Sequence, residues 1–351
     1  MHNDRPHTEE FFMRRALELA RLGMGYVSPN PLVGCVIVHD NKIIGEGWHK
    51  KYGEAHAEVN AVQSMEDKSL LPECVVYVSL EPCSHTGKTP PCADMLITHN
   101  VKKVVIANSD PNPLVAGGGI KKLRAAGIEV VTDVLAAEGR YLNRRFFTSM
   151  QRHRPYVILK WAQTADGFIA RENYDSKWIS NEYSRRLVHK WRAEEDAVLV
   201  GTNTAHYDDP QLNVRDWTGR NPVRVVIDRS LKLEATCKLF DGTQETICYN
   251  LKKDEVHETL TFVRLSEPFT VEDVLQDLHR RRIQSILVEG GTQLLNSFIN
   301  GNLWDEARVF LSACTFTQGI QAPDVAGNLI SQESVMNDRL QIYTSHDKSS
   351  H

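Results

Sequence analysis

Residues 80–92 read Leu-Glu-Pro-Cys-Ser-His-Thr-Gly-Lys-Thr-Pro-Pro-Cys, and an Ala-His-Ala-Glu segment precedes them at residues 55–58. The two stretches supply two thiolates, Cys83 and Cys92, one imidazole, His56, and one carboxylate, Glu58. A catalytic zinc ion takes three such ligands and keeps a fourth position for water, whose protons a nearby carboxylate can move. The two stretches therefore predict a catalytic zinc site with His56, Cys83 and Cys92 as ligands and Glu58 as acid/base.

The same stretch lies at a junction between a β-rich run, residues 74–80, and a helix, residues 92–99. Strands and helices also alternate on either side of it, which is typical of helices packed on both faces of one sheet. The predicted strands are 33–38, 43–48, 74–80, 104–107 and 129–131. The predicted helices are 8–23, one that begins near Ala55, 92–99 and 120–126.

Residues 144–155 form the best candidate for a domain boundary, because they carry five basic or imidazole groups and end in Pro155. They are interpreted as a solvated linker, with contact to a phosphate as the alternative. We therefore predict one domain over residues 1–150 and a second over 151–351, with a disordered tail at 345–351. The second half repeats the βα alternation, which favours a mostly parallel sheet. Its predicted strands are 156–162, 197–201, 223–228, 246–249, 285–289 and 308–311, and its predicted helices are 181–191, 270–280 and 292–300.

Composition limits the classes of protein that remain. A chain of 351 residues with 41 % hydrophobic and 25 % charged residues suits two globular domains. The net charge of −4 gives no general attraction to nucleic acid. The seven cysteines are irregularly spaced and residues 1–15 lack a signal-peptide pattern, so we expect a reduced, cytoplasmic setting. No apolar run approaches the ~20 residues of a membrane span.

The zinc prediction has alternatives. The arrangement matches the H-x-E…P-C-x-x-C signature of zinc nucleobase deaminases, except that eight residues rather than two separate Cys83 from Cys92. The cysteines could instead form a structural zinc site or be inert core thiols. Cys74 and Cys35 lie in predicted strands and are expected in the core, although Cys74 as a fourth ligand would make the site structural.

In the second half, Lys160 interrupts an apolar strand and must either reach solvent or meet an anion. Gly290 and Gly291 stand at a strand-to-helix junction, where backbone amides can meet a cofactor phosphate, although such a pair can also be only a turn. The basic residues of the helix at 181–191, together with Arg192, are either a solvated face or part of a binding site.

Three segments of the first half, residues 28–34 (Ser-Pro-Asn-Pro-Leu-Val-Gly), 56–58 and 80–92, resemble the N-terminal half of the bifunctional deaminase/reductase family of riboflavin biosynthesis. The long spacing between the two cysteines is a property of that family. The resemblance implies a cytidine-deaminase-like three-layer α/β/α domain, in which Asn30, His49 and Lys88 contact the pyrimidine or its ribose phosphate. Residues 110–117 also fit, but Gly118 stands where a basic residue is usual.

The second half resembles the reductase half of the same family, which is similar in fold to dihydrofolate reductase. The resemblance rests on residues 159–167, 176–180, 191–193, 200–215 and 289–291. His206 and Tyr207 replace smaller aliphatic residues. The resemblance implies that the NADPH site is lined by Ala162, Trp178, Thr204 and Asp208. It also implies that the substrate is held by Lys160, Ser176, Arg192, Leu212, Arg215 and Glu289. Arg192 and Arg215 are suited to bidentate contact with a phosphate.

The resemblance implies hydrolytic deamination of 2,5-diamino-6-(5-phosphoribosylamino)pyrimidin-4(3H)-one, followed by NADPH-dependent reduction of its ribosyl chain to a ribityl chain. The expected partners are this small molecule, Zn²⁺ and NADPH, with neither nucleic acid nor membrane, in a homo-oligomer. One rival hypothesis is a nucleic-acid deaminase with an accessory domain, which needs a basic channel and stacking aromatic residues. The other is a binding protein with a structural zinc, which needs four protein ligands.

Overall fold

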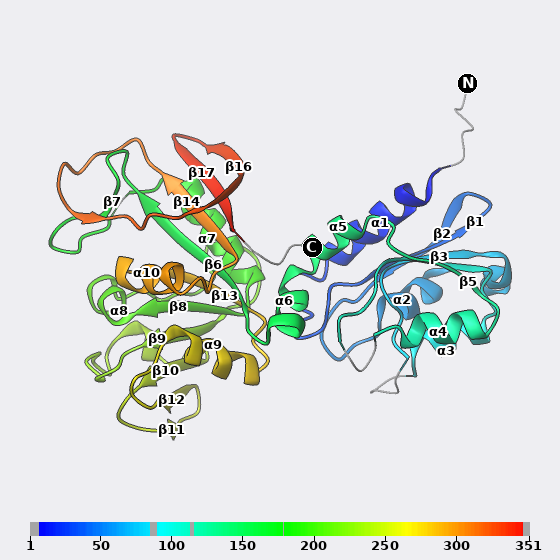
Figure 1. The fold of residues 1–351 in the computed structure, drawn as a ribbon, viewed down its shortest axis with the longest axis horizontal. Coiled ribbons are helices and arrows are strands. Elements are labelled where there is room, and N and C mark those ends of the chain that lie inside the picture. The colour runs from blue at the N-terminus through cyan, green and yellow to red at the C-terminus, as the bar shows by residue number, and fades with distance from the viewer. Residues whose placement is uncertain (1–6, 85–89, 113–115, 178, 347–351) are drawn as a thin grey trace. The chain divides into compact units, whose positions relative to one another are not determined.

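The computed structural model describes residues 7–84, 90–112, 116–177 and 179–346. The chain divides into two compact units, which we call unit 1 (Met1–Arg152) and unit 2 (His153–His351). Each unit is built around its own sheet (Figure 1). Each also has its own hydrophobic core.

Unit 1 contains a five-stranded sheet with the strand order β2-β1-β3-β4-β5. The pairs β1–β2 and β1–β3 are antiparallel, whereas β3–β4 and β4–β5 are parallel. The strands are β1 (Gly34–His39), β2 (Lys42–Trp48), β3 (Val75–Leu80), β4 (Lys103–Asn108) and β5 (Glu129–Val131). The helices are α1 (Glu9–Arg21), α2 (Ala57–Ser64), the 3₁₀ helix η1 (Lys68–Glu73), α3 (Cys92–Thr98), α4 (Gly118–Ala125), α5 (Ala136–Leu142) and α6 (Arg144–Arg152).

The strands of unit 1 bury both faces, because successive side chains point to opposite sides of the sheet. Val76 and Ile106 contact the layer formed by α2, α3 and α4. Tyr77 and Val105 contact the opposite layer, which contains α1 and Leu142 of α5. The result is the predicted three-layer α/β/α arrangement.

Local sequence signals account for several boundaries in unit 1. Thr8 caps α1 by accepting a hydrogen bond from the backbone N–H of Phe11. Asp40 and Asn41 adopt positive φ angles in the turn between β1 and β2. Two consecutive residues of this kind form a tight hairpin turn that follows the twist of the strands.

The prediction of a solvated linker at residues 144–155 was wrong for its larger part. Residues 144–152 form α6, and its Phe146 and Phe147 are buried against Leu80. The arginines dominated the composition of this segment, but Phe146, Phe147 and Met150 recur at the spacing of one helical face. The segment is therefore an amphipathic helix of unit 1.

Unit 2 contains a ten-stranded sheet with the order β11-β12-β10-β9-β8-β13-β6-β14-β17-β16, parallel from β12 to β14. Its strands are β6 (Tyr156–Gln163), β8 (Ala197–Gly201), β9 (Val223–Ile227), β10 (Thr246–Asn250), β11 (Glu255–Val256), β12 (Leu260–Arg264), β13 (Ser285–Gly290), β14 (Glu306–Leu311), β16 (Gly327–Val335) and β17 (Asp338–Ser345). A separate pair consists of β7 (Phe168–Ala170) and β15 (Ile320–Gln321). The helices are α7 (Glu182–Glu194), α8 (Thr202–Asp208), the 3₁₀ helix η2 (Lys238–Phe240), α9 (Val271–Arg280) and α10 (Thr292–Asn300).

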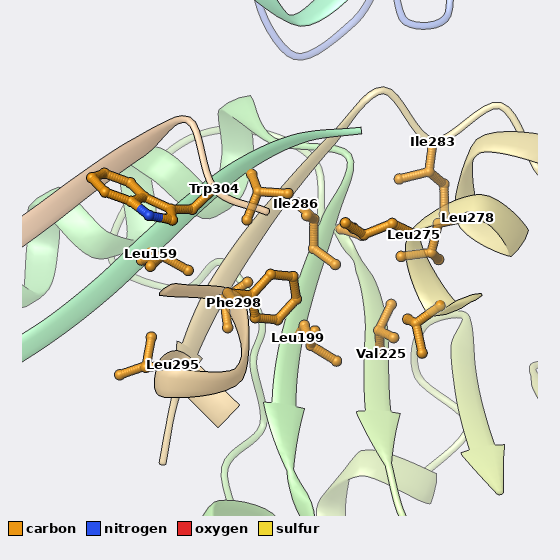
Figure 2. Close-up of a cluster of buried hydrophobic side chains, with 14 of the residues drawn as sticks. Leu159, Leu199, Val225, Leu275, Leu278, Ile283, Ile286, Leu295, Phe298 and Trp304 are labelled. Carbon is orange, nitrogen blue, oxygen red and sulfur yellow. The ribbon is translucent and has the colours of Figure 1, made fainter. Parts of the chain in front are cut away.

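Helices cover both faces of this sheet. Leu275 and Leu278 of α9 and Phe298 of α10 face Leu199 and Val225 of the central strands in the largest hydrophobic cluster (Figure 2). The opposite face packs against α7 and α8 in two smaller clusters. Parallel strands buried on both sides place their carboxyl ends along one edge, where ligands of α/β proteins bind.

The sequence did not predict the whole of unit 2. The antiparallel strands β16 and β17 extend the sheet, and Ser345, the first residue of the predicted tail, is the last residue of β17. The remainder of that tail, from residue 347, lies outside the described residues. Within the described ranges, no helix is long and apolar enough to cross a membrane.

Candidate active sites

The predicted zinc ligands converge in unit 1, although they come from three segments. His56 is the N-cap of α2, Cys83 follows β3, and Cys92 is the first residue of α3. Their ligand atoms all lie within 4.8 Å of one another. His56 Nδ1 lies 3.6 Å from Cys83 Sγ and 3.3 Å from Cys92 Sγ.

These distances fit a tetrahedral metal site. Zn–S and Zn–N bonds of about 2.3 and 2.0 Å at tetrahedral angles place nitrogen and sulfur about 3.5 Å apart. The backbone N–H of Cys92 also donates a hydrogen bond of 3.3 Å to Cys83 Sγ. A hydrogen bond to sulfur favours the thiolate, which is the form that binds metal.

Glu58 is buried in the first turn of α2, two residues after His56. Burial raises the pKa of its carboxyl group to about 7, and the negative charge of Cys83 acts in the same direction. A carboxyl group with a pKa near neutrality can both accept and donate a proton.

Glu81 fixes the backbone next to the cluster through hydrogen bonds, a role that the sequence did not reveal. Its buried carboxylate accepts hydrogen bonds from the backbone N–H groups of Asp110 (3.2 Å), Gly117 (3.0 Å), Gly119 (3.0 Å) and Ile120 (3.2 Å). One side chain thus fixes the loop after β4 and the start of α4 next to Pro82 and Cys83.

Two of the three residues predicted to contact the pyrimidine ribotide lie together. The ring nitrogens of His49 contact Asn30 Nδ2 at 3.1 Å and the carbonyl oxygen of Ala55 at 3.1 Å. The rings of His49 and His56 meet edge to face at 5.6 Å, which places Asn30 and His49 beside the cluster. The third residue, Lys88, lies outside the described residues.

The other thiols of unit 1 are not part of the cluster. Cys35 and Cys74 are buried in the core, as predicted. Cys74 Sγ donates a hydrogen bond to the carbonyl oxygen of Leu70. Within the described residues, the cluster has three protein ligands, as a catalytic zinc site requires.

Unit 2 contains a cavity of about 780 Å³. It is lined by every residue predicted to bind substrate or cofactor in this unit, apart from Trp178, which lies outside the described residues. These residues are Lys160, Ala162, Ser176, Arg192, Thr204, Asp208, Leu212, Arg215, Glu289, Gly290 and Gly291.

Lys160, Glu289 and Arg192 form a group of interacting charges in the cavity lining, of which Arg192 is buried. Burial lowers the pKa of Lys160, and Glu289 opposes this effect. Burial acts to raise the pKa of Glu289, but the charge and hydrogen bonds of Arg192 together with the charge of Lys160 outweigh it, so the pKa of this carboxyl group is lowered. Lys160 is therefore a partly buried lysine at the cavity whose protonated form is favoured by the charge of Glu289.

The geometry of Arg192 differs from the expectation of a guanidinium that faces a phosphate. Its Nε and Nη2 donate to the two carboxylate oxygens of Glu289 at 2.6 and 2.8 Å, and Nη1 donates to the carbonyl oxygen of Asn213 at 3.1 Å. Arg215 also lines the cavity, with a side chain that is 53 % exposed and whose Nη1 donates to Asn213 Oδ1 at 3.1 Å.

The paired glycines meet Thr204 at the end of β13. A Cβ atom at Gly290 would lie 3.1 Å from the Thr204 side chain, and Gly291 has a φ of 68°. Both positions therefore favour glycine. The turn brings the backbone at the start of α10 to the cavity, where α8 contributes Thr204 and Asp208.

Several cavity residues escaped the sequence analysis. Asp228, Arg229, Ser230 and Lys232 directly follow β9, and the rule that ligands bind beyond the carboxyl ends of parallel strands could have found them. His189, which the sequence left open as part of either a solvated face or a binding site, lines the cavity with 3 % exposure, and its Nδ1 contacts the carbonyl oxygen of Asn213. Tyr174 had no sequence signal.

Unit 1 thus has a three-ligand zinc-type cluster beside a buried carboxylate, as in zinc-dependent hydrolases, and unit 2 is a second α/β unit with a large charged ligand cavity. Two protein-family models match the chain: "Cytidine and deoxycytidylate deaminase zinc-binding region" over residues 6–108 and "RibD C-terminal domain" over residues 155–327.

Full-length relatives agree. The riboflavin biosynthesis protein RibD of Aquifex aeolicus is 42 % identical over 320 residues, which cover 90 % of this chain and 89 % of that protein. RibD of Escherichia coli is 36 % identical and covers 87 % of both chains. The chain belongs to the RibD family of riboflavin biosynthesis proteins.

A solved structure from Thermotoga maritima, described as a diaminohydroxyphosphoribosylaminopyrimidine deaminase/5-amino-6-(5-phosphoribosylamino)uracil reductase, is 39 % identical with a TM-score of 0.89. The match covers 96 % of this chain and 98 % of that one. RibD of Acinetobacter baumannii is 34 % identical with a TM-score of 0.88, over 97 % and 99 % of the chains.

Family membership confirms the predicted fold class and enzyme class. The chain is a bifunctional enzyme of riboflavin biosynthesis that acts on small molecules, with a zinc-dependent deaminase and an NADPH-dependent reductase. The reductase match accounts for unit 2, which disfavours the hypothesis of a nucleic-acid deaminase with an accessory domain. The zinc-binding family match likewise favours a catalytic over a purely structural metal.

Proposed function

We propose that unit 1 deaminates 2,5-diamino-6-(5-phosphoribosylamino)pyrimidin-4(3H)-one and that unit 2 reduces the ribosyl chain of the product to a ribityl chain. The observation that carries the proposal is the convergence of His56, Cys83 and Cys92 beside the buried Glu58. The two family matches, which fall on either side of residue 150, support a boundary between the two domains near that residue.

In unit 1, His56, Cys83 and Cys92 would hold Zn²⁺, which when bound activates water at neutral pH. Glu58 accepts a proton from the attacking water and delivers it to the departing amine, so that the C–N bond breaks and ammonia leaves. Asn30 and His49 orient the pyrimidine ring, which their position beside the cluster supports.

In unit 2, NADPH when bound supplies the hydride. Thr204, Asp208, Ala162 and the backbone of Gly290 and Gly291 line its part of the cavity. The positive charge of Arg229 and Lys232, beyond the carboxyl end of β9, suits the phosphates of the cofactor.

On the substrate side of the cavity, oppositely charged side chains lie next to one another. Lys160 and Glu289 supply a donor and an acceptor for the ribosyl hydroxyl groups, and Arg192 orients Glu289. Arg215 faces the ribose phosphate, while Ser176 and Leu212 shape the wall.

We also propose that the protein works in the cytoplasm and as a homo-oligomer. The seven cysteines are free thiols, which suits a reducing compartment. The edge strand β16 carries the half-exposed side chains of Leu329 and Ile330, and proteins commonly cover such an edge. Light scattering of the purified protein measures its mass and tests the oligomer.

The decisive experiment follows ammonia release and NADPH oxidation separately with the diaminopyrimidine ribotide. Glu58→Gln keeps the size of the side chain but removes its ability to carry a proton. We expect loss of ammonia release, with NADPH oxidation unchanged when the deaminated product is supplied. If a folded, zinc-loaded Glu58→Gln protein loses both activities, the assignment of Glu58 to deamination alone is wrong.

A further inference from the structure

Tyr174 and Tyr207 form an aromatic stack at the wall of the unit 2 cavity. Their ring centroids lie 4.3 Å apart and their planes differ by 4°. Both residues line the cavity and are partly exposed, by 39 % and 51 %. The pair joins two separate segments, because Tyr207 belongs to α8 whereas Tyr174 precedes α7.

Tyr174 lies in a tight turn of residues 171–177. Its N–H donates to the carbonyl oxygen of Arg171 at 3.0 Å, and the N–H of Arg171 donates to the carbonyl oxygen of Asp175 at 2.9 Å. Tyr174 has a φ of 69°, a conformation that costs free energy in a residue other than glycine. The surrounding contacts must therefore hold this turn in place, and the stack with Tyr207 is one of them.

A second contact joins the same two segments. Ser176 Oγ donates a hydrogen bond of 3.3 Å to Asp208 Oδ1. On α8, Thr204, Tyr207 and Asp208 are spaced by three and four residues and so share one helical face. Both contacts hold residues 171–177 against the face of α8 that borders the cavity.

We propose that the Tyr174–Tyr207 stack is a positioning contact that fixes residues 171–177, and with them Ser176, for binding of the pyrimidine ribotide. The inference rests on the proposed function of unit 2. Loss of the stack releases the turn, whereas α8 remains anchored by its packing on β8 and β9.

The test compares Tyr207→Leu and Tyr174→Leu with Tyr207→Phe and Tyr174→Phe. The leucine variants remove the stack, and we expect the KM for the deaminated ribotide to rise about two- to tenfold, the range of an aromatic pair. The KM for NADPH should change much less, because Asp208 and Thr204 stay on α8. The phenylalanine variants keep the rings and should behave as the unchanged protein.

Two further comparisons separate positioning from general destabilisation. Because both tyrosines act through one contact, the double leucine variant should show the KM of a single variant rather than the product of two effects. Tyr183→Leu is the matched control, since Tyr183 is exposed on α7 and outside the cavity lining. It should leave both KM values unchanged, and ammonia release should be the same in every variant.

The proposal is overturned if the leucine variants leave the ribotide KM unchanged or raise both KM values equally. It is also overturned if the two leucine substitutions act independently in the double variant, or if the phenylalanine variants are as impaired as the leucine variants. Hydrogen exchange of residues 171–177 provides a readout without turnover. It should be faster in Tyr207→Leu and unchanged in Tyr207→Phe. If the unchanged protein fails to oxidise NADPH, the proposed function fails, while the exchange data still decide whether the stack holds the turn.

Discussion

Arg224 shows how one buried residue supports the cavity of unit 2. It lies on β9 with 1 % exposure, and its Nε donates to the carbonyl oxygen of Gln211 at 2.8 Å. Its Nη1 donates to Asp241 Oδ1 at 2.6 Å. The side chain therefore ties the loop that carries Leu212 and Arg215 to the centre of the sheet, and Asp241 neutralises its charge.

Asp241 gives a prediction for acid stability. The hydrogen bond from Arg224 lowers the pKa of Asp241 from 3.8 to about 2. Because the folded pKa lies below the unfolded one, the pair stabilises fully above about pH 4, by about 2 kcal/mol, and loses this contribution as the pH falls toward 2. Asp241→Asn should therefore lower the free energy of unfolding at pH 7, and the difference should shrink between pH 5 and pH 3.

Urea unfolding followed by tryptophan fluorescence measures this effect, since five of the six tryptophans lie in unit 2. The matched control is Asp254→Asn, which changes an exposed ion pair with Arg264 in the same unit. It should have little effect at any pH. A difference for Asp241→Asn that stays constant from pH 7 to pH 3 would contradict the assignment.

For single residues, residue type and spacing predicted the metal ligands but not the contacts that depend on the folded backbone. Only a few residue types can bind a metal ion, so His56, Cys83 and Cys92 could be predicted. Glu81 could not, because its four acceptor contacts are to backbone N–H groups, which every sequence supplies. Arg192 was assigned to the cavity, but its pairing with Glu289 depends on how α7 faces β13.

The helix α4 carries no zinc ligand, but it packs against the segment that follows β3 and holds Cys83. Gly119 packs directly on the loop that carries Cys83, and a Cβ atom there would lie 2.0 Å from the carbonyl oxygen of Pro82. A Cβ atom at Gly118 would instead meet Ser84 Oγ at 2.5 Å. The two neighbouring glycines thus differ in what would have to move: backbone for one, a rotatable side chain for the other.

This difference yields a matched pair of variants. Gly119→Ala must displace either α4 or Pro82, and we expect a loss of about 1–3 kcal/mol in stability, weaker zinc binding and slower ammonia release. Gly118→Ala should be nearly neutral, because Ser84 can rotate. Chelator competition measures zinc affinity in both variants. Equal zinc affinities in the two proteins would show that α4 does not position the ligand loop.

Sequence patterns predicted some helices and strands correctly and missed others. β5 has the predicted bounds, Glu129–Val131, because its short β-rich run is separated from α4 by Gly127. The helix α6 was missed because three arginines outweighed its two buried phenylalanines. The strand β16 is mostly polar and exposed, and it becomes a strand by pairing with β17, a tertiary contact that its own sequence does not record.

For the whole molecule, the two chemistries fall on separate parts of the chain. Every zinc ligand belongs to unit 1, and every residue of the cavity belongs to unit 2. Each unit also buries its own hydrophobic core. A fusion of this kind places consecutive steps on one chain without requiring that they share a residue.

Zinc removal tests this separation. A protein stripped of metal by a chelator should lose ammonia release, because His56, Cys83 and Cys92 have no ion to hold, and the thermal transition of unit 1 should fall, since bound metal contributes folding free energy. NADPH oxidation with the deaminated ribotide should persist, and so should the fluorescence-detected unfolding of unit 2. Added Zn²⁺ should restore ammonia release alone. Loss of NADPH oxidation in the stripped protein, recovered with Zn²⁺, would mean that the reductase depends on the folded zinc site, and the separation inferred from the placement of the residues would be wrong.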